Sequence, residues 1–308
     1  MATETPRTTS RLAPTVLLLA GVGVVAAYAV TGERVRSVDG LPHAVVSAAS
    51  LLSAIVILLR SRRPEGWRSA TWLGLGCLGL AAVNAAFLVA AVNGGVPAGP
   101  TRYDTVFLMV GVPFLAAVGV EFRNHVARDD RREIVADVAL LSAAIGTMLF
   151  LYLREAGAQP QTTASAAQFA LLVATAFSSF GALALWLPNP AHLGMFAAAT
   201  GICSAILTFA PQWLDGSFQV GQPRVEVPIA LSCLFLAVLV VSIPRRSEDR
   251  RQKDPGRSGR AILTTLSVTA ACGALGLVAM QEIDNRIGTV QASLLIGMLA
   301  AAVALRSS

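Results

Sequence analysis

The sequence predicts an all-α membrane protein, a polytopic bundle of about ten spanning helices with both termini in the cytoplasm. Hydrophobic residues make up 55% of the 308 positions and charged residues only 14%, whereas soluble domains contain about 25% charged residues. Apolar runs long enough to cross a bilayer recur along the whole chain. Basic residues are concentrated in alternate connections between these runs, which is the usual topology signal of membrane proteins.

The expected spans follow a short cytoplasmic tail, residues 1–11. The 21 uncharged residues from Leu12 to Gly32 are longer than the apolar part of a typical signal peptide, so we expect an uncleaved first span. A basic cytoplasmic loop at 244–260 then separates an eight-span bundle, residues 12–243, from a final pair of spans, residues 261–308. The expected spans are 12–31, 41–59, 70–92, 104–121, 135–153, 165–187, 191–211, 227–244, 261–280 and 287–305.

Two of these spans are short between charges. Asp104 and Glu121 enclose 16 uncharged residues, and Asp137 and Arg154 enclose another 16. We expect the charged side chains at such ends to extend to the membrane surface.

The distribution of arginine predicts the orientation. With the N-terminus inside, the inner segments carry 18 of the 24 basic residues, and the outer segments carry only Arg34, Arg36, Arg102, Arg154, Arg224 and Arg286. The positive-inside rule therefore places both termini on the cytoplasmic side of the plasma membrane. The expected cytoplasmic basic surface contains Arg123, Arg131, Arg132, Arg245, Arg246, Arg250 and Arg251. These residues lie between apolar runs, so the bilayer and not nucleic acid is the expected partner.

The 244–260 loop is expected to be a solvated connector, with contact to anionic lipid headgroups as the alternative.

Motifs for catalysis and metal binding are absent from the sequence, which contains no HExxH, CxxC, GxSxG or Walker pattern. The three histidines lie near span ends and lack the spacing of metal ligands. We therefore expect no enzymatic activity, metal or cofactor in this chain. The cysteines lie within apolar runs, which favours buried thiols over disulfides or metal ligands: Cys77, Cys203, Cys233 and Cys272.

Gly74, Gly76 and Gly79 spell the GxGxxG pattern, but they lie inside an expected span. A dinucleotide site would require a strand before the pattern in a soluble βαβ unit. Small residues inside a membrane helix instead allow a neighbouring helix to approach closely.

Polar residues in or near the expected spans are the candidates for ligand or signal binding. Asn84 lies deep in its span, where a polar group normally faces the bundle interior. Asp104, Asp137 and Glu226 lie near helix N-termini, where the helix dipole favours an anion. For Glu226 this structural role is sufficient, and Asp137 is also within reach of nearby arginines. The candidates are Asn84, Tyr103, Asp104 and Asp137.

The stretch from Arg63 to Ala143 carries a loose series of motifs. A basic loop leads to a tryptophan and a glycine-rich span, then to an outer loop with prolines before an aspartate and an aromatic residue. A span containing proline follows, and a second basic loop ends in an aspartate. The residues are Arg63, Trp67, Gly74, Gly79, Pro97, Pro100, Asp104, Phe107, Pro113, Arg123, Asp130, Arg131, Arg132 and Asp137.

This series resembles the N-terminal integral-membrane sensor region of actinobacterial signalling proteins that carry GGDEF and EAL domains. The resemblance implies a sensory module that works in cyclic di-GMP signalling as a homodimer. It implies an output domain in the same chain or in a partner, attached where the last helix enters the cytoplasm. Relatives often have an acidic residue in the sixth span, where this chain has the sequence 177–180, Phe-Ser-Ser-Phe. No GGDEF or EAL residues are present, so this chain itself is not expected to make or hydrolyse cyclic di-GMP.

Two other functions fit the sequence. A permease of the drug/metabolite transporter type would also have ten spans and both ends inside, but its two five-span repeats have no obvious counterpart here. The third function is a structural subunit that helps a partner to assemble.

Overall fold

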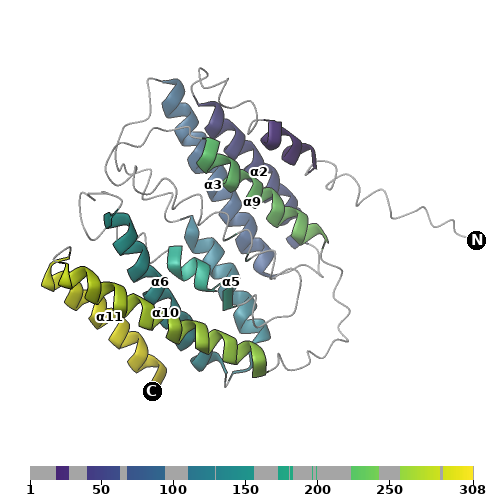
Figure 1. Cartoon of the computed structure of the whole chain (residues 1–308). Coiled ribbons are helices and arrows are strands. Elements are labelled where there is room, and N and C mark those ends of the chain that lie inside the picture. Colours follow the sequence, from purple (N-terminus) through teal and green to yellow (C-terminus); the bar gives the residue numbers. More distant parts are fainter. Residues whose placement is uncertain are drawn as a thin grey trace, which may run out of the picture.

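The computed structural model describes the chain in segments, and every regular element in them is a helix (Figure 1). The described residues are 19–27, 40–62, 68–93, 110–128, 130–155, 173–179, 181–182, 196, 199, 223–242, 257–284 and 287–307. The long helices are α2 (Leu41–Ser61), α3 (Arg68–Val92), α5 (Gly111–His125), α6 (Arg131–Glu155), α9 (Pro223–Ser242), α10 (Arg257–Ile283) and α11 (Thr289–Ser307).

Four segments are long and apolar enough to cross a membrane: Leu41–Ser61, Ser69–Val92, Arg131–Arg154 and Arg260–Glu282. Two shorter apolar helical segments, Val227–Val238 and Thr289–Ala304, coincide with the expected eighth and tenth spans. The prediction of an all-α fold is therefore confirmed for the described residues, and the length and apolar composition of these helices agree with a membrane protein. The expected spans at 12–31, 165–187 and 191–211 lie largely outside them.

Several helix boundaries differ from the expected spans by a few residues, and two of them change the interpretation of the sequence. The helix α10 begins at Arg257, so the end of the expected 244–260 loop is helical. The helix α5 begins at Gly111, which places Pro113 in its first turn and not at the centre of a span. Proline is tolerated there because the first N–H groups of a helix have no intrahelical acceptor.

The start of α2 depends on a glycine. Gly40 has φ +82°, and a Cβ atom at this position would lie 2.7 Å from the Leu88 side chain. A left-handed backbone conformation and a close neighbour both favour glycine. Pro42 then lies in the first turn of α2, where its fixed φ suits a helix start.

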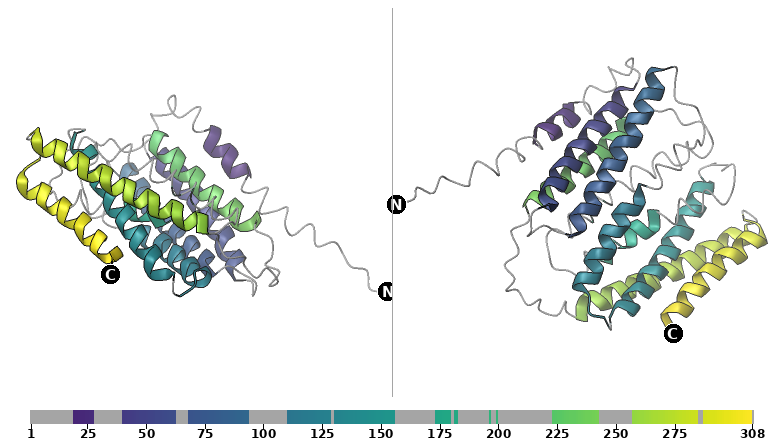
Figure 2. Two further views of the ribbon diagram at one scale, coloured as in Figure 1. Left: turned by 60° about the horizontal axis from the view of Figure 1, so that its bottom comes forward. Right: turned by 180° about the vertical axis from the view of Figure 1, so that it is seen from behind.

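The helices form two groups that share one large apolar core. In the first group α2 packs against α3 and α9, and α3 also packs against α5. In the second group α10 and α11 form a hairpin that packs against α6. Figures 1 and 2 show this hairpin along one edge of the bundle, away from α2, α3 and α9. The main core includes residues of both groups, and a smaller apolar cluster lies between α6 and the hairpin.

The glycines of α3 provide close helix contacts, as the sequence predicts. A Cβ atom on Gly74 would lie 2.7 Å from Leu58 of α2. A Cβ atom on Gly76 would lie 2.7 Å from the ring of Phe114 in α5. Glycine at these two positions of α3 thus leaves room for the side chains of α2 and α5 to pack closely against the helix.

The described arginines gather at one end of the bundle. At this basic end α6 and α10 begin side by side, because Arg260 contacts both Asp130 and Glu133. The start of α3 lies there too, since Ser69 contacts Glu121 near the end of α5. The basic end carries Arg60, Arg62, Arg68, Arg123, Arg128, Arg131, Arg132, Arg257, Arg260 and Arg306, and the opposite end carries Arg154 and Arg224. The described helices therefore have the strong arginine asymmetry that the sequence predicts.

Candidate functional site

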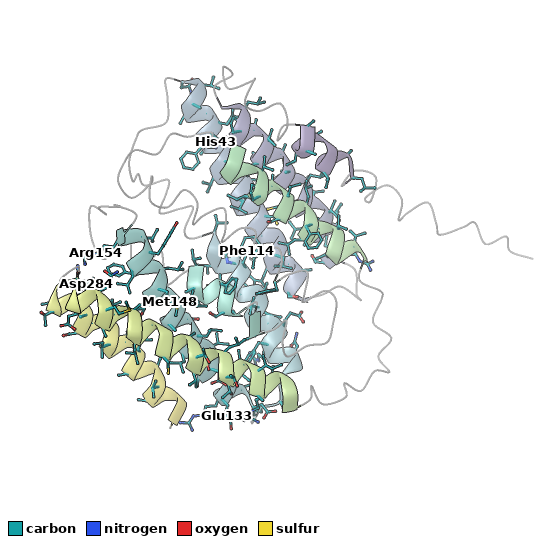
Figure 3. All side chains as sticks on the ribbon, in the orientation of Figure 1. His43, Phe114, Glu133, Met148, Arg154 and Asp284 are labelled. Carbon is teal, nitrogen blue, oxygen red and sulfur yellow. The ribbon has the colours of Figure 1, made fainter. Side chains whose placement is uncertain are left out.

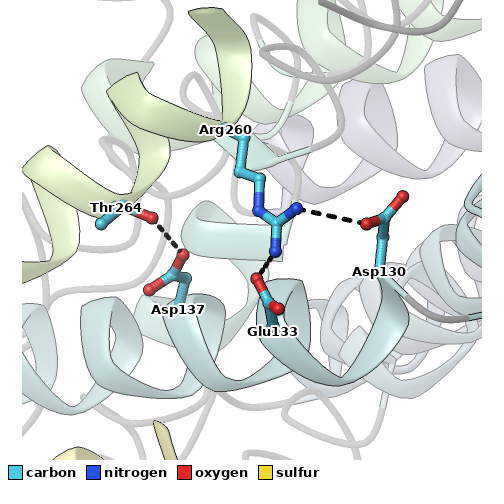
Figure 4. A network of polar contacts seen from close by, with 5 residues as sticks. All are labelled: Asp130, Glu133, Asp137, Arg260 and Thr264. Atoms are coloured by element: carbon cyan, nitrogen blue, oxygen red, sulfur yellow. Dashed lines mark hydrogen bonds and ion pairs between the residues drawn. The ribbon is translucent and has the colours of Figure 1, made fainter. Parts of the chain in front are cut away.

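The candidate site is a polar joint between α6 and the α10–α11 hairpin. Its centre is Asp137, which lies in the second turn of α6 and is only 3% exposed. The Thr264 hydroxyl of α10 donates to Asp137 Oδ2 at 2.7 Å, and the Ser267 hydroxyl lies 3.2 Å from Oδ1. Residues three apart lie on the same helix face, so both hydroxyls meet the carboxyl group from one side. Figure 4 shows Thr264 pointing across the interface toward Asp137.

The two hydroxyl groups are unequal donors. Ser267 has a single hydroxyl proton, and its oxygen lies 2.9 Å from the Thr264 carbonyl oxygen as well as 3.2 Å from Asp137. Its proton is therefore shared between two acceptors. Thr264 makes the shorter bond to Asp137, so we expect it to be the main hydrogen-bond donor at this joint.

Charged residues surround the joint on the side of the basic end. Arg260 lies one turn before Thr264 and forms ion pairs with Asp130, at 3.3 Å, and with Glu133 (Figure 4). These side chains are 34–62% exposed. Water and salt screen exposed pairs, so they orient α10 against α6 but contribute little to stability.

A second polar contact joins α6 to the hairpin at the opposite end of α6, this time through α11. Arg154 donates to the side-chain oxygen of Gln291 near the start of α11. Figure 3 shows Glu133 and Arg154 near the two ends of α6, with Met148 between them. Between the polar contacts the interface is apolar and rich in alanine: Leu140, Ala143, Ala144, Ala271, Ala274, Leu299 and Ala302. The hairpin is therefore held to α6 by polar contacts at both ends and by small side chains between them.

Asn84 lies in a different interface, between α3 and α2. Its Oδ1 atom lies 3.2 Å from His43 Nδ1, and its amide nitrogen donates to the Leu80 carbonyl at 2.9 Å. Because the amide oxygen can only accept, the His43 proton of this contact is on Nδ1. The ring of Phe87 stacks on His43 at a centroid distance of 5.3 Å. The prediction that Asn84 faces the bundle interior is confirmed, since it is 6% exposed.

Glu121 is a polar residue whose place the sequence interpretation missed. We expected its side chain to extend to the membrane surface, but it is only 1% exposed. It lies at the α3–α5 interface, where it accepts a hydrogen bond from Ser69. The expectation was wrong because α3 and α5 cross closely here, and the carboxyl group finds a donor on α3 within the bundle. A serine in the first turn of one span and an acid in the last turn of the next were the only signals in the sequence.

The other candidates do not gather around Asp137. Asn84 belongs to the other helix group, and Tyr103 and Asp104 lie outside the described residues, as do Arg245, Arg246, Arg250 and Arg251. Arg123 and Arg132 are exposed at the basic end. The Arg131 side chain donates to the carbonyl oxygens of Arg123, at 2.7 Å, and of Val126, at 3.0 Å, and so caps the end of α5.

The cysteines agree with their predicted role only in part. Cys77 and Cys233 are buried free thiols, whereas Cys272 is exposed. The prediction is wrong for Cys272 because α10 lies at the edge of the bundle and turns this side outward. Among the described residues, no group of three or more His, Cys, Asp or Glu side chains could hold a metal ion.

Comparisons with models of protein families, with curated proteins and with solved structures find no significant match to this chain.

Proposed function

We propose that this chain is the membrane-embedded input region of a signalling protein, in which the α10–α11 hairpin transmits a change in helix packing to a cytoplasmic output. The observation that carries the proposal is the joint at Asp137. The hairpin contacts the other long helices mainly through α6. A shift of α6 therefore moves the hairpin directly, and the buried carboxyl group determines where α10 rests. A polar residue inside a membrane bundle is costly, and it usually marks a functional position.

The α6–α10 interface is suited to two alternative packings. A sensor of this kind requires two arrangements of similar energy that a signal can bias. If α10 slid along α6 by three residues, about 4.5 Å, Ser267 would replace Thr264 as the nearer donor to Asp137. The alanines of the interface present small side chains that offer little steric resistance to this movement.

For this function we propose that the chain lies in the plasma membrane, crosses it ten times and has both termini in the cytoplasm. Ten of the twelve described arginines lie at the basic end, which supports this orientation. The hairpin returns to the same end, since Arg306 closes α11 there. Fusions test the orientation: green fluorescent protein attached after Ser308 should fluoresce, and alkaline phosphatase at the same site should be inactive. An active phosphatase would contradict it.

The output proposed is a cyclic di-GMP enzyme, in the same chain or in a partner, because the stretch from Arg63 to Ala143 resembles the sensor regions that precede GGDEF and EAL domains. The chain itself performs no chemistry in this scheme. A homodimer would bring two outputs together.

The experiment joins a GGDEF reporter domain after Ser308 and measures cellular cyclic di-GMP. We expect Asp137→Asn and Thr264→Val to change the steady level severalfold in the same direction, because about 1 kcal/mol at the joint changes a two-state ratio about fivefold. Ser47→Ala is the matched control, since its hydroxyl donates at 2.9 Å to the Ala81 carbonyl in the other helix group. The proposal fails if both joint variants are as abundant as the wild type and have the same output.

A further inference from the structure

The turn between α5 and α6 is held by one arginine side chain. Arg131, at the start of α6, donates to the carbonyl oxygen of Arg123 at 2.7 Å and to that of Val126 at 3.0 Å. Carbonyl groups at the end of a helix have no intrahelical donor, and they form the negative end of the helix dipole. Arg131 supplies positive donors there, so the end of α5 repels an anion less than an uncapped helix end.

Three exposed arginines surround this turn, and we call them the basic corner: Arg123, Arg128 and Arg132. The hydrogen bond from Arg131 to Arg123 brings the end of α5 close to the start of α6. Arg132 follows Arg131 directly, and Arg128 lies in the turn itself. The three arginines of the basic corner therefore come from one small area of the surface.

The described acidic side chains near the basic corner already have partners. Asp130 and Glu133 form ion pairs with Arg260 of α10 (Figure 4). Glu121 is buried and accepts a hydrogen bond from Ser69. The helices α6 and α10 also begin side by side here, so the positive ends of two helix dipoles lie at the same place. The basic corner is therefore suited to an anion.

The surface next to the basic corner is apolar and open. Val135 is 50% exposed and lies on the same face of α6 as Arg132, one turn further into the bundle. Gly119 has the same relation to Arg123 on α5, and a Cβ atom there would meet no atom within 4 Å. Trp72, in the second turn of α3, is exposed at this end of the bundle, as is typical of tryptophan at the level of the lipid headgroups. Arginines beside an open apolar surface match the two parts of a phospholipid better than they match a soluble anion.

We propose that the basic corner is a binding site for an anionic phospholipid, whose phosphate contacts the three arginines and whose acyl chains lie along α5 and α6. Arginine suits this role because its planar guanidinium group can donate two parallel hydrogen bonds to a phosphate. Each arginine near an anionic lipid surface strengthens binding about fivefold. This inference stands apart from the proposed function, because lipid binding can be measured on the chain alone.

The experiment measures lipid binding to the full chain, purified in detergent, by native mass spectrometry. The chain is titrated with phosphatidylglycerol, which is anionic, and with phosphatidylcholine of the same acyl chains, which is zwitterionic. The wild type should bind the first phosphatidylglycerol molecule at least about fivefold more tightly than phosphatidylcholine. An excess of glycerol 3-phosphate, which has the phosphate but no acyl chain, should not displace it.

Variants locate the site. Arg123→Gln and Arg128→Gln each change an exposed side chain, so the fold should be kept, and each should reduce the preference for phosphatidylglycerol about fivefold. Arg154→Gln is the matched control, since it removes one positive charge at the opposite end of α6, and it should keep the preference of the wild type.

Three results would overturn the proposal. The first is a wild type that binds both lipids equally, which requires no variant. The second is a loss of preference in Arg154→Gln as large as in Arg123→Gln and Arg128→Gln. The third is displacement of phosphatidylglycerol by glycerol 3-phosphate, which would identify the basic corner as a site for a soluble phosphate.

Discussion

The joint at Asp137 makes a quantitative prediction about two hydroxyl groups on α10. Thr264→Val replaces the hydroxyl with a methyl group of nearly the same shape and removes the 2.7 Å donor to Asp137. Ser267→Ala removes a donor at 3.2 Å whose proton is shared with a carbonyl oxygen. We therefore expect Thr264→Val to lower the free energy of unfolding more than Ser267→Ala.

The magnitude follows from the burial of the carboxyl group. Leaving a buried acceptor without its donor costs about 1–3 kcal/mol, while hydrogen bonds between membrane helices average about 0.6 kcal/mol and reach about 1.7 kcal/mol. Because Asp137 is 3% exposed, we place Thr264→Val at about 1–2 kcal/mol. The longer, shared bond of Ser267 should contribute less than about 0.6 kcal/mol.

Thermal unfolding in detergent, under reducing conditions, measures these differences. A thiol-reactive fluorescent dye reports unfolding, because Cys77 and Cys233 are buried in the folded chain. Cys203→Ser and Cys272→Ser are included in every variant, so that only the buried thiols of Cys77 and Cys233 report unfolding. At about 2–4 °C per kcal/mol, Thr264→Val should lower the melting temperature by about 2–8 °C.

A double-mutant cycle with Asp137→Leu provides the control. This change removes both acceptor oxygens, so Thr264→Val should then cost almost nothing, and the coupling free energy should be about 1–2 kcal/mol. Two results would refute the reasoning. One is an equal or larger cost for Ser267→Ala, and the other is an unchanged cost of Thr264→Val in the Asp137→Leu background.

Two further predictions concern helix contact and surface charge. Gly76→Ala places a Cβ atom 2.7 Å from the Phe114 ring, whereas the same change at Gly297 meets no atom within 4 Å. Replacing glycine by alanine improves helix propensity by up to about 1 kcal/mol in both variants. The clash with Phe114 should nevertheless make Gly76→Ala about 1–3 kcal/mol less stable than Gly297→Ala, which a lower melting temperature would show. Equal melting temperatures would contradict the α3–α5 contact. Arg260→Gln removes the exposed ion pairs with Asp130 and Glu133 and should cost less than about 1 kcal/mol. The loss of stability should become smaller in about 0.5 M salt, because exposed charges are screened more strongly there than at about 0.1 M, where the Debye length is about 10 Å. A large loss that does not change with salt would contradict the conclusion that the ion pairs are exposed and screened by solvent.

The close contacts of α3 show how far a local pattern can predict tertiary structure. Gly74, Gly76 and Gly79 predicted a close helix neighbour, because small residues in an apolar helix leave room for one. The pattern did not identify the neighbours. The structure assigns Leu58 of α2 to Gly74 and Phe114 of α5 to Gly76, and this depends on the register in which three helices pack.

The polar residues show where such prediction fails. The position of Asp137 at the start of a span was evident from the sequence, yet its partner Thr264 lies 127 residues away. Glu121 appeared to be an ordinary charge at the end of a span, and its burial depends on how α3 crosses α5.

The sequence by itself determined the class of the protein, the positions of most described helices and the concentration of arginine at one end. These properties depend on composition and on the length of apolar runs, because each membrane helix satisfies its own backbone hydrogen bonds and can be recognised alone. Only the tertiary structure decided which helices are neighbours and which polar side chains meet. Neighbouring membrane helices are selected by close packing and by a few hydrogen bonds across long sequence separations. The apolar runs have nearly uniform hydrophobicity and do not encode those choices in any local pattern.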